Sequence, residues 1–232
     1  MKTFVSIFAV LLFAFALHGE PEKKADAPKT VSPPQSGQTN SWKSLFEGEL
    51  RKNWVVTDFG GHGEVEWTNK QVTLGLGNDL TGIHFTNIAT LPKVDFEIAL
   101  EAKRMDGNDF FCGLTFPVKD SFCTLIVGGW GGALVGISSL DAMDASENDT
   151  THFLKFERDH WYRIRVRVTE PKIQVWIDDD RIIDADITER KVSMRPGEIE
   201  SSKPLGIATW ETKGVIRDMK IREVGPKEKS KP

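Results

Sequence analysis

Hydrophobic and polar residues alternate over long stretches of the chain between residues 42 and 224. Residues 162–168 (YRIRVRV) place apolar side chains on one face and three arginines on the other, and residues 95–101 (DFEIALE) place Glu97 and Glu101 on the polar face. A repeat of two is typical of a strand that is buried on one face. Other strand-like runs lie at 65–67, 72–76, 82–86, 110–116, 122–127, 134–138, 153–156, 173–177, 182–185, 205–210 and 215–224.

Gly, Pro, Asn and Asp residues separate most of these runs, as they do in turns between strands. No run is long at helical spacing, and a weak helical turn at residues 139–145 is the main helical feature we expect. Strands with one polar face favour antiparallel pairing, because parallel sheets are covered on both sides and have continuous apolar strands. The predicted fold class is therefore all-β, a two-sheet antiparallel jelly-roll sandwich.

The N-terminal residues 1–19 have the pattern of a secretory signal peptide. Lys2 precedes an apolar run at residues 4–17, and small residues such as Gly19 follow. The run is shorter than the roughly 20 residues that a membrane span needs, so we expect cleavage rather than a stable anchor. The predicted localisation is exported, either periplasmic or extracellular. Residues 148–150 (NDT) form a glycosylation sequon, which matters only in a eukaryotic secretory pathway.

Two segments outside the alternating region differ from it in composition. Residues 20–41 contain four prolines among Lys, Ser, Gln, Thr and Asn, with almost no large apolar side chain. Such a segment cannot offset the entropy cost of ordering, so we expect a flexible linker. Residues 225–232 contain three lysines and one glutamate, and we expect a disordered basic tail. The predicted sandwich domain is residues 42–224.

The overall composition removes some classes of function. Hydrophobic residues make up 39% of the chain, with 7 Trp and 14 Phe, which is enough for a substantial core. The 30 basic and 34 acidic residues give a net charge of −4, whereas nucleic-acid-binding proteins usually carry a basic surface. We therefore expect no nucleic-acid partner.

Few motifs of known chemistry are present. The sequence has no Walker phosphate loop, no Gly-x-Ser-x-Gly elbow, and no His-Glu-x-x-His or Cys-x-x-Cys motif. The histidines after the signal peptide stand alone, and a single histidine is more often structural than catalytic; they are His62, His84, His152 and His160. We expect no cofactor and assign no metal site.

Cys112 and Cys123 permit two interpretations, because a disulfide can form in an exported protein. If residues 117–118 form the centre of the intervening turn, the two cysteines lie opposite each other at a bridgeable distance. If the turn is centred on residues 119–120, the cysteines are staggered and remain free thiols. Neither cysteine is assigned a catalytic role.

The segment 128–132 (GGWGG) is the most unusual in the chain. Glycines allow close approach of the backbone and would leave Trp130 free to stack on a ligand. A sugar platform is one interpretation, because an aromatic face suits the apolar face of a pyranose ring. The other is a tight corner in which Trp130 closes one end of the sandwich.

Paired carboxylates matter because glycoside hydrolysis usually needs two of them around the scissile bond. Glu97 and Glu101 share a strand face, but their backbones are about 13 Å apart, so each would need a partner from a neighbouring strand. In the alternative interpretation they pair with the arginines of the other alternating strand. Asn108 and Asp109 belong to a polar loop at residues 105–109, which either holds sugar hydroxyls or a calcium ion or is a solvated turn.

Short motifs along the chain match those of one family. They are residues 44–48 (SLFEG) followed by Trp54, residues 95–98 (DFEI), Trp161 with residues 173–178 (IQVWID), and residues 204–207 (PLGI) through 216–221 (IRDMKI). Together they resemble the bacterial 3-keto-disaccharide hydrolase domain family over most of residues 42–224. The resemblance implies a concanavalin A-like sandwich and a role in carbohydrate chemistry.

The chain departs from the family pattern at several polar positions. Where relatives often show Gln and His after the closing Ile-Gly-Leu, this chain has Ala208, Thr209 and Trp210. Tyr162 replaces an Asn, and residues 179–180 (DD) replace Asn-Gly. Groups expected to face a sugar are thus partly replaced, which leaves open whether the protein is an enzyme.

Two functional hypotheses follow. The first is an exported glycoside hydrolase that cleaves a glycosidic bond in a glycoside or 3-keto-glycoside. Its candidate catalytic residues are Glu97, Glu101 and Asp109, and its candidate substrate-binding residues are Trp130, Asn108 and Trp210. The second hypothesis is a non-catalytic glycan-binding or cell-envelope interaction module on the same fold. The expected partner is a carbohydrate or glycoside ligand, and a cell-envelope protein is the other candidate.

Overall fold

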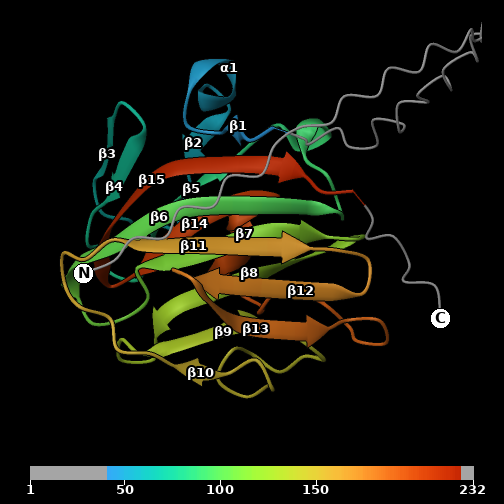
Figure 1. Ribbon diagram of the computed structural model, residues 1–232. Helices are drawn as coiled ribbons and strands as arrows, with labels where there is room; N and C mark the ends of the chain where they lie inside the picture. Colours follow the sequence, from blue (N-terminus) through green and yellow to red (C-terminus); the bar gives the residue numbers. More distant parts are fainter. Residues whose placement is uncertain (1–40, 226–232) are drawn as a thin grey trace, which may run out of the picture. The chain divides into compact units, whose positions relative to one another are not determined.

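The computed structural model describes residues 41–225, which form two antiparallel β-sheets packed face to face (Figure 1). The predicted signal peptide lies outside the described residues. So do all but the last residue of the predicted linker and all but the first residue of the predicted tail. None of the helices within residues 41–225 is long and apolar enough to cross a membrane.

Sheet A contains eight strands and carries the charged outer face of the sandwich. Its order is β13-β12-β11-β6-β15-β4-β3, and β1 pairs with β15. The strands are β13 (Asp180–Asp186), β12 (Lys172–Ile177), β11 (Tyr162–Val168), β6 (Phe96–Gly107), β15 (Thr212–Glu223), β4 (Gln71–Leu74), β3 (Val65–Thr68) and β1 (Lys43–Ser44). Strands β6 and β15, with 12 residues each, form the centre of this sheet.

Sheet B contains seven strands, in the order β10-β9-β8-β7-β14-β5-β2. They are β10 (His152–Phe153), β9 (Leu134–Ser138), β8 (Ser121–Gly129), β7 (Cys112–Val118), β14 (Leu205–Trp210), β5 (Leu80–Phe85) and β2 (Trp54–Val56). The described helices are short: α1 (Gly48–Arg51) and the 3-10 turns η1 (Ile88–Thr90) and η2 (Glu198–Ser202).

The main core lies between the two sheets. Sheet A contributes alternate residues such as Ile98, Leu100 and Val166, and sheet B contributes residues such as Leu114 and Leu125. All of these side chains are almost fully buried. The alternation seen in the sequence therefore marks the faces of both sheets that meet, and the prediction of an all-β antiparallel sandwich is confirmed.

The predicted helical turn at residues 139–145 was wrong. Leu140 and Met143 instead exchange backbone hydrogen bonds of 3.0 Å in both directions. Asp141 and Ala142 between them have φ angles of 55° and 65°. Two successive left-handed residues make a tight reversal and cannot continue a right-handed helix. Leu140 also bridges to Val192, which ties this turn to a distant segment.

The two sheets differ on their outer faces. Strand β11 of sheet A alternates between buried and more exposed residues, so its arginines face solvent. Strands β7 and β9 of sheet B are buried at every position. Loops therefore cover part of the outer face of sheet B, and the hollow that they leave uncovered is the candidate functional site.

Candidate functional site

A cavity of about 480 Å³ opens on the outer face of sheet B. Strands β5, β7, β8, β9 and β14 lie beneath or beside it, and the loops around residues 109, 130 and 195–199 form its walls. We call it the sheet B cavity. Its lining residues are Asp79, Leu80, Asp109, Phe110, Thr124, Ile126, Trp130, Ser138, Arg195, Pro196, Gly197, Glu198, Ile199 and Trp210.

Glycines on the outer face of sheet B allow the surrounding loops to pack directly against the strands. A Cβ atom at Gly136 would lie 2.6 Å from the carbonyl oxygen of Ala145, and one at Gly206 would lie 2.4 Å from that of Ser202. A Cβ at Gly113 would meet the Phe110 ring at 2.9 Å. Because glycine has no side chain, the loops that form the walls of the cavity can lie directly against the strands at these positions.

Trp130 projects from the turn that joins β8 to β9, and 43% of its surface is exposed. Its φ of 47° is in the left-handed region, and Gly128, Gly131 and Gly132 have φ angles of 80°, 83° and 107°. A left-handed tryptophan is strained, and such strain often occurs at functional sites. The exposed ring and the strained turn together favour a role in binding.

Arg104 supports this turn from inside the sandwich. It occupies a core-facing position of β6, is only 5% exposed, and donates from Nη2 to the carbonyl oxygen of Gly132 at 2.8 Å. A Cβ at position 132 would lie 2.5 Å from Nη1 of Arg104, so only glycine fits there. The sequence analysis missed Arg104, although a charged residue at an inward position of an alternating strand was a visible signal.

Asp109 connects the cavity wall to the same turn. Its Oδ1 accepts a hydrogen bond from the backbone N–H of Phe110 at 2.8 Å, and its Oδ2 accepts one from Gly131 at 3.2 Å. Because a carboxylate has about four lone-pair sites, each oxygen can still accept a further bond from a ligand. Asp109 therefore both positions the Trp130 turn and presents a carboxylate to the cavity.

Trp210 and Arg195 contribute to other parts of the cavity wall. Trp210 is the last residue of β14 and is partly buried. The guanidinium carbon of Arg195 lies 6.0 Å from the centre of the Trp130 ring, and Arg195 also pairs with Asp144 at 3.4 Å. The lining thus combines two indoles with three carboxylates and one guanidinium; these charged residues are Asp79, Asp109, Glu198 and Arg195.

The structure brings together some of the predicted site residues but not all of them. Asp109, Trp130 and Trp210 line the sheet B cavity. Asn108 precedes Asp109, but its side chain accepts a hydrogen bond from Arg158 at 3.3 Å and does not line the cavity. Sequence reasoning also missed Asp79 and Arg195, which stand in loops, and Glu198, the first residue of η2; none belongs to a recognisable motif.

Glu97 and Glu101 lie on the outer face of the other sheet, so the three predicted catalytic carboxylates do not converge. Glu97 is fully buried and accepts hydrogen bonds from Arg165 at 2.9 Å, from Arg167 at 2.6 Å and from Arg222 at 2.7 Å. Glu101 pairs with Arg217 at 2.5 Å. The alternative interpretation of the sequence was that these glutamates pair with the arginines of the other alternating strand. Glu97 does so, with Arg165 and Arg167.

Charge pairing keeps Glu97 ionised in spite of its burial. Burial alone would raise the pKa of Glu97, but the hydrogen bond from Arg222 and the charge of Arg167 outweigh it and hold the pKa below its ordinary value. A carboxylate enclosed by guanidinium groups is a poor proton donor at neutral pH. This arrangement is typical of a structural ion cluster.

The remaining sequence candidates have structural explanations. The turn between β7 and β8 is centred on Lys119 and Asp120, so Cys112 pairs with Val127 and both cysteines are free and buried.

Asn148 of the sequon is 6% exposed, and its amide donates to the carbonyl oxygens of three residues, which leaves it enclosed in the fold. Within residues 41–225 no three His, Cys, Asp or Glu side chains cluster as metal ligands.

Comparison with known proteins defines the class and then the family. The fold is that of lectin-like jelly-roll sandwiches. The family model described as "3-keto-alpha-glucoside-1,2-lyase-like domain" matches residues 41–222, and the chain belongs to this family. The resemblance found in the sequence is thus confirmed. No curated protein matches the sequence.

Solved structures with this fold are distant in sequence. The Crh5 transglycosylase aligns with a TM-score of 0.54 at 12% identity, over 81% of this chain and 85% of its own. Carbohydrate-binding module CBM66 from Bacillus subtilis aligns with a TM-score of 0.50 at 13% identity, over 74% and 96%. The exoplasmic/lumenal domain of VIP36 aligns with a TM-score of 0.51 at 13% identity, over 81% and 89%. At these identities the likeness concerns the fold alone.

Proposed function

We propose that the protein binds a carbohydrate in the sheet B cavity, with a sugar ring stacked on Trp130. The observation that carries the proposal is the exposed indole held by a strained, buttressed turn at the edge of a cavity lined with carboxylates. Aromatic faces suit the apolar faces of sugars, and carboxylates accept hydrogen bonds from hydroxyl groups. Trp210 provides a second apolar surface in the same cavity.

Family membership and the fold support this proposal. The family is described by an activity on a 3-keto-α-glucoside, and structures with the same fold carry the titles of a carbohydrate-binding module and of a domain bound to Ca²⁺ and Man3GlcNAc. Relatives often show Gln and His where this chain has Ala208, Thr209 and Trp210. Of these three residues, Ala208 and Trp210 face outward from β14 on this side of sheet B. Replacing polar groups with apolar ones there favours binding over proton transfer.

Cleavage of a glycosidic bond in a glycoside or 3-keto-glycoside is the second candidate function. It is favoured by the family and by Asp109, the one predicted catalytic carboxylate that lines the cavity. In hydrolysis, Asp109 would exchange a proton with the reacting groups while water adds to the anomeric carbon and the glycosidic bond breaks. In elimination, it would remove the proton from C2, which a C3 ketone acidifies, and the bond at C1 would break without water.

Export is part of the same proposal. The signal-peptide pattern of residues 1–19 supports cleavage during secretion and a location in the periplasm or the extracellular medium. The test is N-terminal sequencing of the protein recovered from each cell fraction. A new N-terminus close to residue 20 supports export, and recovery from the cytoplasm with the N-terminus intact would overturn it.

Binding and product analysis on the full chain test the two functions together. The probes are trehalose and 3-keto-trehalose, followed by a panel of neutral oligosaccharides, and the variants are Trp130→Ala with Trp161→Ala as the control. Trp161 stacks on Lys103 and Arg217 of sheet A, so its loss removes an indole far from the cavity. We expect Trp130→Ala to weaken binding by about tenfold, or roughly 1.4 kcal/mol, and the control to leave binding unchanged.

Each outcome has a defined meaning. Binding without new products supports a glycan-binding module. A new reducing sugar without an unsaturated ketone indicates hydrolysis. A new reducing sugar together with an unsaturated ketone that absorbs in the ultraviolet indicates elimination, because the leaving sugar is released in both reactions. Loss of these products in Asp109→Asn would assign the carboxylate. Equal binding by the two tryptophan variants, or no binding to any sugar, would overturn the proposed site.

A further inference from the structure

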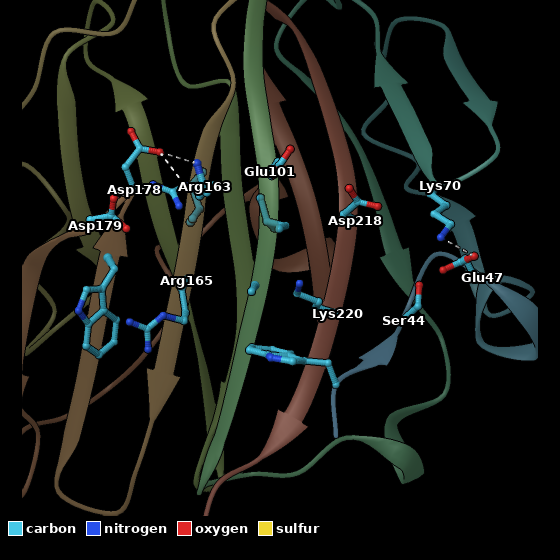
Figure 2. A pocket seen from close by; sticks show the side chains of 15 residues that line it. Ser44, Glu47, Lys70, Glu101, Arg163, Arg165, Asp178, Asp179, Asp218 and Lys220 are labelled. Carbon is cyan, nitrogen blue, oxygen red and sulfur yellow. Dashed lines mark hydrogen bonds and ion pairs between the residues drawn. The ribbon is translucent and has the colours of Figure 1, made fainter. Parts of the chain in front are cut away.

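A second hollow, of about 590 Å³, lies on the outer face of sheet A and is separate from the sheet B cavity (Figure 2). We call it the sheet A groove and define it by the residues Trp42, Ala99, Glu101, Arg165, Trp176 and Lys220. None of these residues lines the sheet B cavity. The proposed carbohydrate site therefore leaves this groove without a role.

The groove exists because one residue of a cross-strand row is small. Ala99 of β6 pairs with Arg165 of β11 on one side and with Lys220 of β15 on the other. The row continues to Trp176 of β12 and Ser44 of β1. A large residue at position 99 would fill the space between the two cations, whereas alanine leaves the floor open.

Tryptophans and cations occupy one end of the groove. The guanidinium carbon of Arg165 lies 3.7 Å from the centre of the Trp176 ring. Arg222, which does not line the groove, lies behind Trp42, with its guanidinium carbon 4.5 Å from the centre of that ring. Lys220 stands near Trp42, with its Nζ 5.3 Å from the ring centre. The two indoles hold the long cationic side chains in fixed orientations, which reduces the entropy lost on binding.

The cations at this end outnumber the carboxylate that they enclose. Arg165, Arg167 and Arg222 all pair with Glu97, three guanidiniums against one carboxylate, for a formal charge of +2. Each guanidinium has more N–H donors than it uses on Glu97. All three arginine side chains remain between a quarter and a third exposed. Of the three, only Arg165 lines the groove, so it and Lys220 are the donors available to an anionic ligand there, and the net charge of the cluster adds to the positive potential at this end.

Carboxylates occupy the opposite end. Figure 2 shows Glu101, Asp178 and Asp218 displaced along the strands from Arg165 and Lys220. Arg163 pairs with Asp179 at 2.9 Å and with Asp178 at 3.6 Å, and Arg217 pairs with Glu101. Asp178, Asp179 and Glu101 are thus paired, whereas Asp218 has no ion pair among the described residues. The oxygens of all four can accept hydrogen bonds from hydroxyl groups.

We propose that the sheet A groove is a second binding site, for a glycan segment that carries a carboxylate or sulfate group. The anionic group would lie between Arg165 and Lys220 above Ala99, and the sugar hydroxyls would face the carboxylates at the opposite end. From Trp176 to Ser44 the row crosses four inter-strand steps, or about 19 Å, which is long enough for more than one sugar unit. The two indoles provide apolar surfaces along it.

The test measures binding of the full chain to short oligogalacturonate, to a sulfated tetrasaccharide and to a neutral galactose oligomer, by calorimetry at low and moderate salt. Ala99→Leu fills the floor without changing charge, and Lys220→Gln removes one cation. Lys213→Gln is the matched control, because Lys213 is an exposed lysine on the same strand and does not line the groove. Thermal unfolding of each variant confirms that it is folded.

We expect at least one anionic oligosaccharide to bind and the neutral one to bind at least about tenfold more weakly. Ala99→Leu should reduce the affinity for the anionic oligosaccharide about tenfold or more. Lys220→Gln should reduce it about threefold and make it less dependent on salt, and Lys213→Gln should leave the affinity unchanged. Preference for the carboxylate or the sulfate probe identifies the anionic group.

The proposal would be overturned if neither anionic probe bound, or if Lys220→Gln and Lys213→Gln lost the same amount of affinity. Trp130→Ala serves to separate this site from the sheet B cavity. If Trp130→Ala abolishes anionic binding while Ala99→Leu does not, the ligand occupies the cavity, and the groove proposal fails while the proposed function stands.

Discussion

The outer faces of the two sheets differ in how they are stabilised and in what they offer a ligand. Sheet A keeps large charged side chains on its outer face, and cross-strand ion pairs such as Arg167–Glu97–Arg222 hold them in place. Sheet B places glycines such as Gly136 and Gly206 on its outer face, so that loops pack directly on the strands. Ion pairs between side chains thus stabilise the outer face of sheet A, whereas contacts between loops and the strand backbone stabilise that of sheet B.

This difference explains why the cavity lies on sheet B. Loops that rest on a strand surface of small residues can enclose a hollow and bring distant residues together, as they do for Asp79, Asp109 and Arg195. The side chains of sheet A fill most of their own surface, and the groove above Ala99 is one of the hollows that they leave. Substitutions on the two faces should therefore have different effects on stability and on binding.

The largest stability effect should come from Glu97 on sheet A. Glu97→Gln keeps the size of the side chain but leaves three guanidiniums without their shared counter-ion. We expect the free energy of unfolding at pH 7 to fall by about 3 kcal/mol, measured by urea titration. Glu66→Gln, at an exposed position of β3, is the control and should change stability by less than about 0.5 kcal/mol. A loss below about 1 kcal/mol would contradict the ion-cluster account.

The same substitution has a pH signature. The pKa of Glu97 is lowered in the folded protein, because ion pairing with Arg222 and Arg167 outweighs the burial that would raise it. Its contribution to stability is present above the unfolded pKa of about 4.3 and is lost as the pH falls through the lower folded pKa. The gap in stability between wild type and Glu97→Gln should therefore narrow in acid, whereas a gap that widened would contradict the sign of the shift.

A smaller effect is expected from adding one carbon atom to the outer face of sheet B. In Gly136→Ala the new Cβ would lie 2.6 Å from the carbonyl oxygen of Ala145, so the loop must move. We expect a loss of about 2 kcal/mol in the free energy of unfolding. In the control Gly61→Ala the nearest atom, Cβ of Asn78, lies 3.4 Å away, and the change should be within about 0.5 kcal/mol. Equal effects in the two variants would show that the loop is not closely packed.

The strained turn predicts an inverted order for two variants of Trp130. Where alanine can adopt the native backbone conformation, a protein with glycine at that position is less stable by about 0.4–1 kcal/mol, because glycine has more freedom in the unfolded chain. At the φ of 47° found for Trp130, alanine is strained and glycine is not. Trp130→Gly should therefore be more stable than Trp130→Ala, by about 1 kcal/mol in thermal or urea unfolding. The ordinary order would contradict the left-handed turn.

The smallest effect, close to zero, should come from reducing agents. Cys112 and Cys123 are free, and burial raises the pKa of the Cys112 thiol to about 12 and that of Cys123 as well. Both thiols should react with a thiol reagent only after denaturation, and dithiothreitol should leave Tm unchanged. A mass lower by two hydrogens, or a Tm that falls on reduction, would show that the cysteines are bridged.

Much of the fold could be predicted because alternation reflects burial on one side. Residues 134–138, 162–168 and 205–210 were predicted with the bounds that β9, β11 and β14 have in the structure. Strand β6 was predicted to end at Glu101, but it continues to Gly107. The prediction stopped early because Arg104, which is buried in the structure, interrupts the apolar face of the strand in the sequence. Strands β1 and β2 were missed, since they have two and three residues and depend on pairing with distant strands.

The candidate site could be predicted only in part. The glycines around Trp130 drew attention to a residue that lines the cavity. Alternation placed Glu97 and Glu101 on a polar face of a strand, but it cannot tell to which of the two sheets that strand belongs. In the structure both glutamates lie on the outer face of sheet A, whereas the cavity lies on the outer face of sheet B. Arg195 lies just before η2 and Glu198 begins it, and the position of η2 depends on contact with β5 and β14 rather than on local sequence.

Carbohydrate binding in the sheet B cavity can be tested most directly by a crystal structure of the full chain with the sugar that binds most tightly among trehalose, 3-keto-trehalose and the neutral panel. We expect electron density for a sugar ring in the sheet B cavity, stacked on Trp130 and hydrogen-bonded to Asp109 or Glu198. Sugar bound on the sheet A groove alone, or a Trp130 turn that does not present its ring to the cavity, would contradict this expectation.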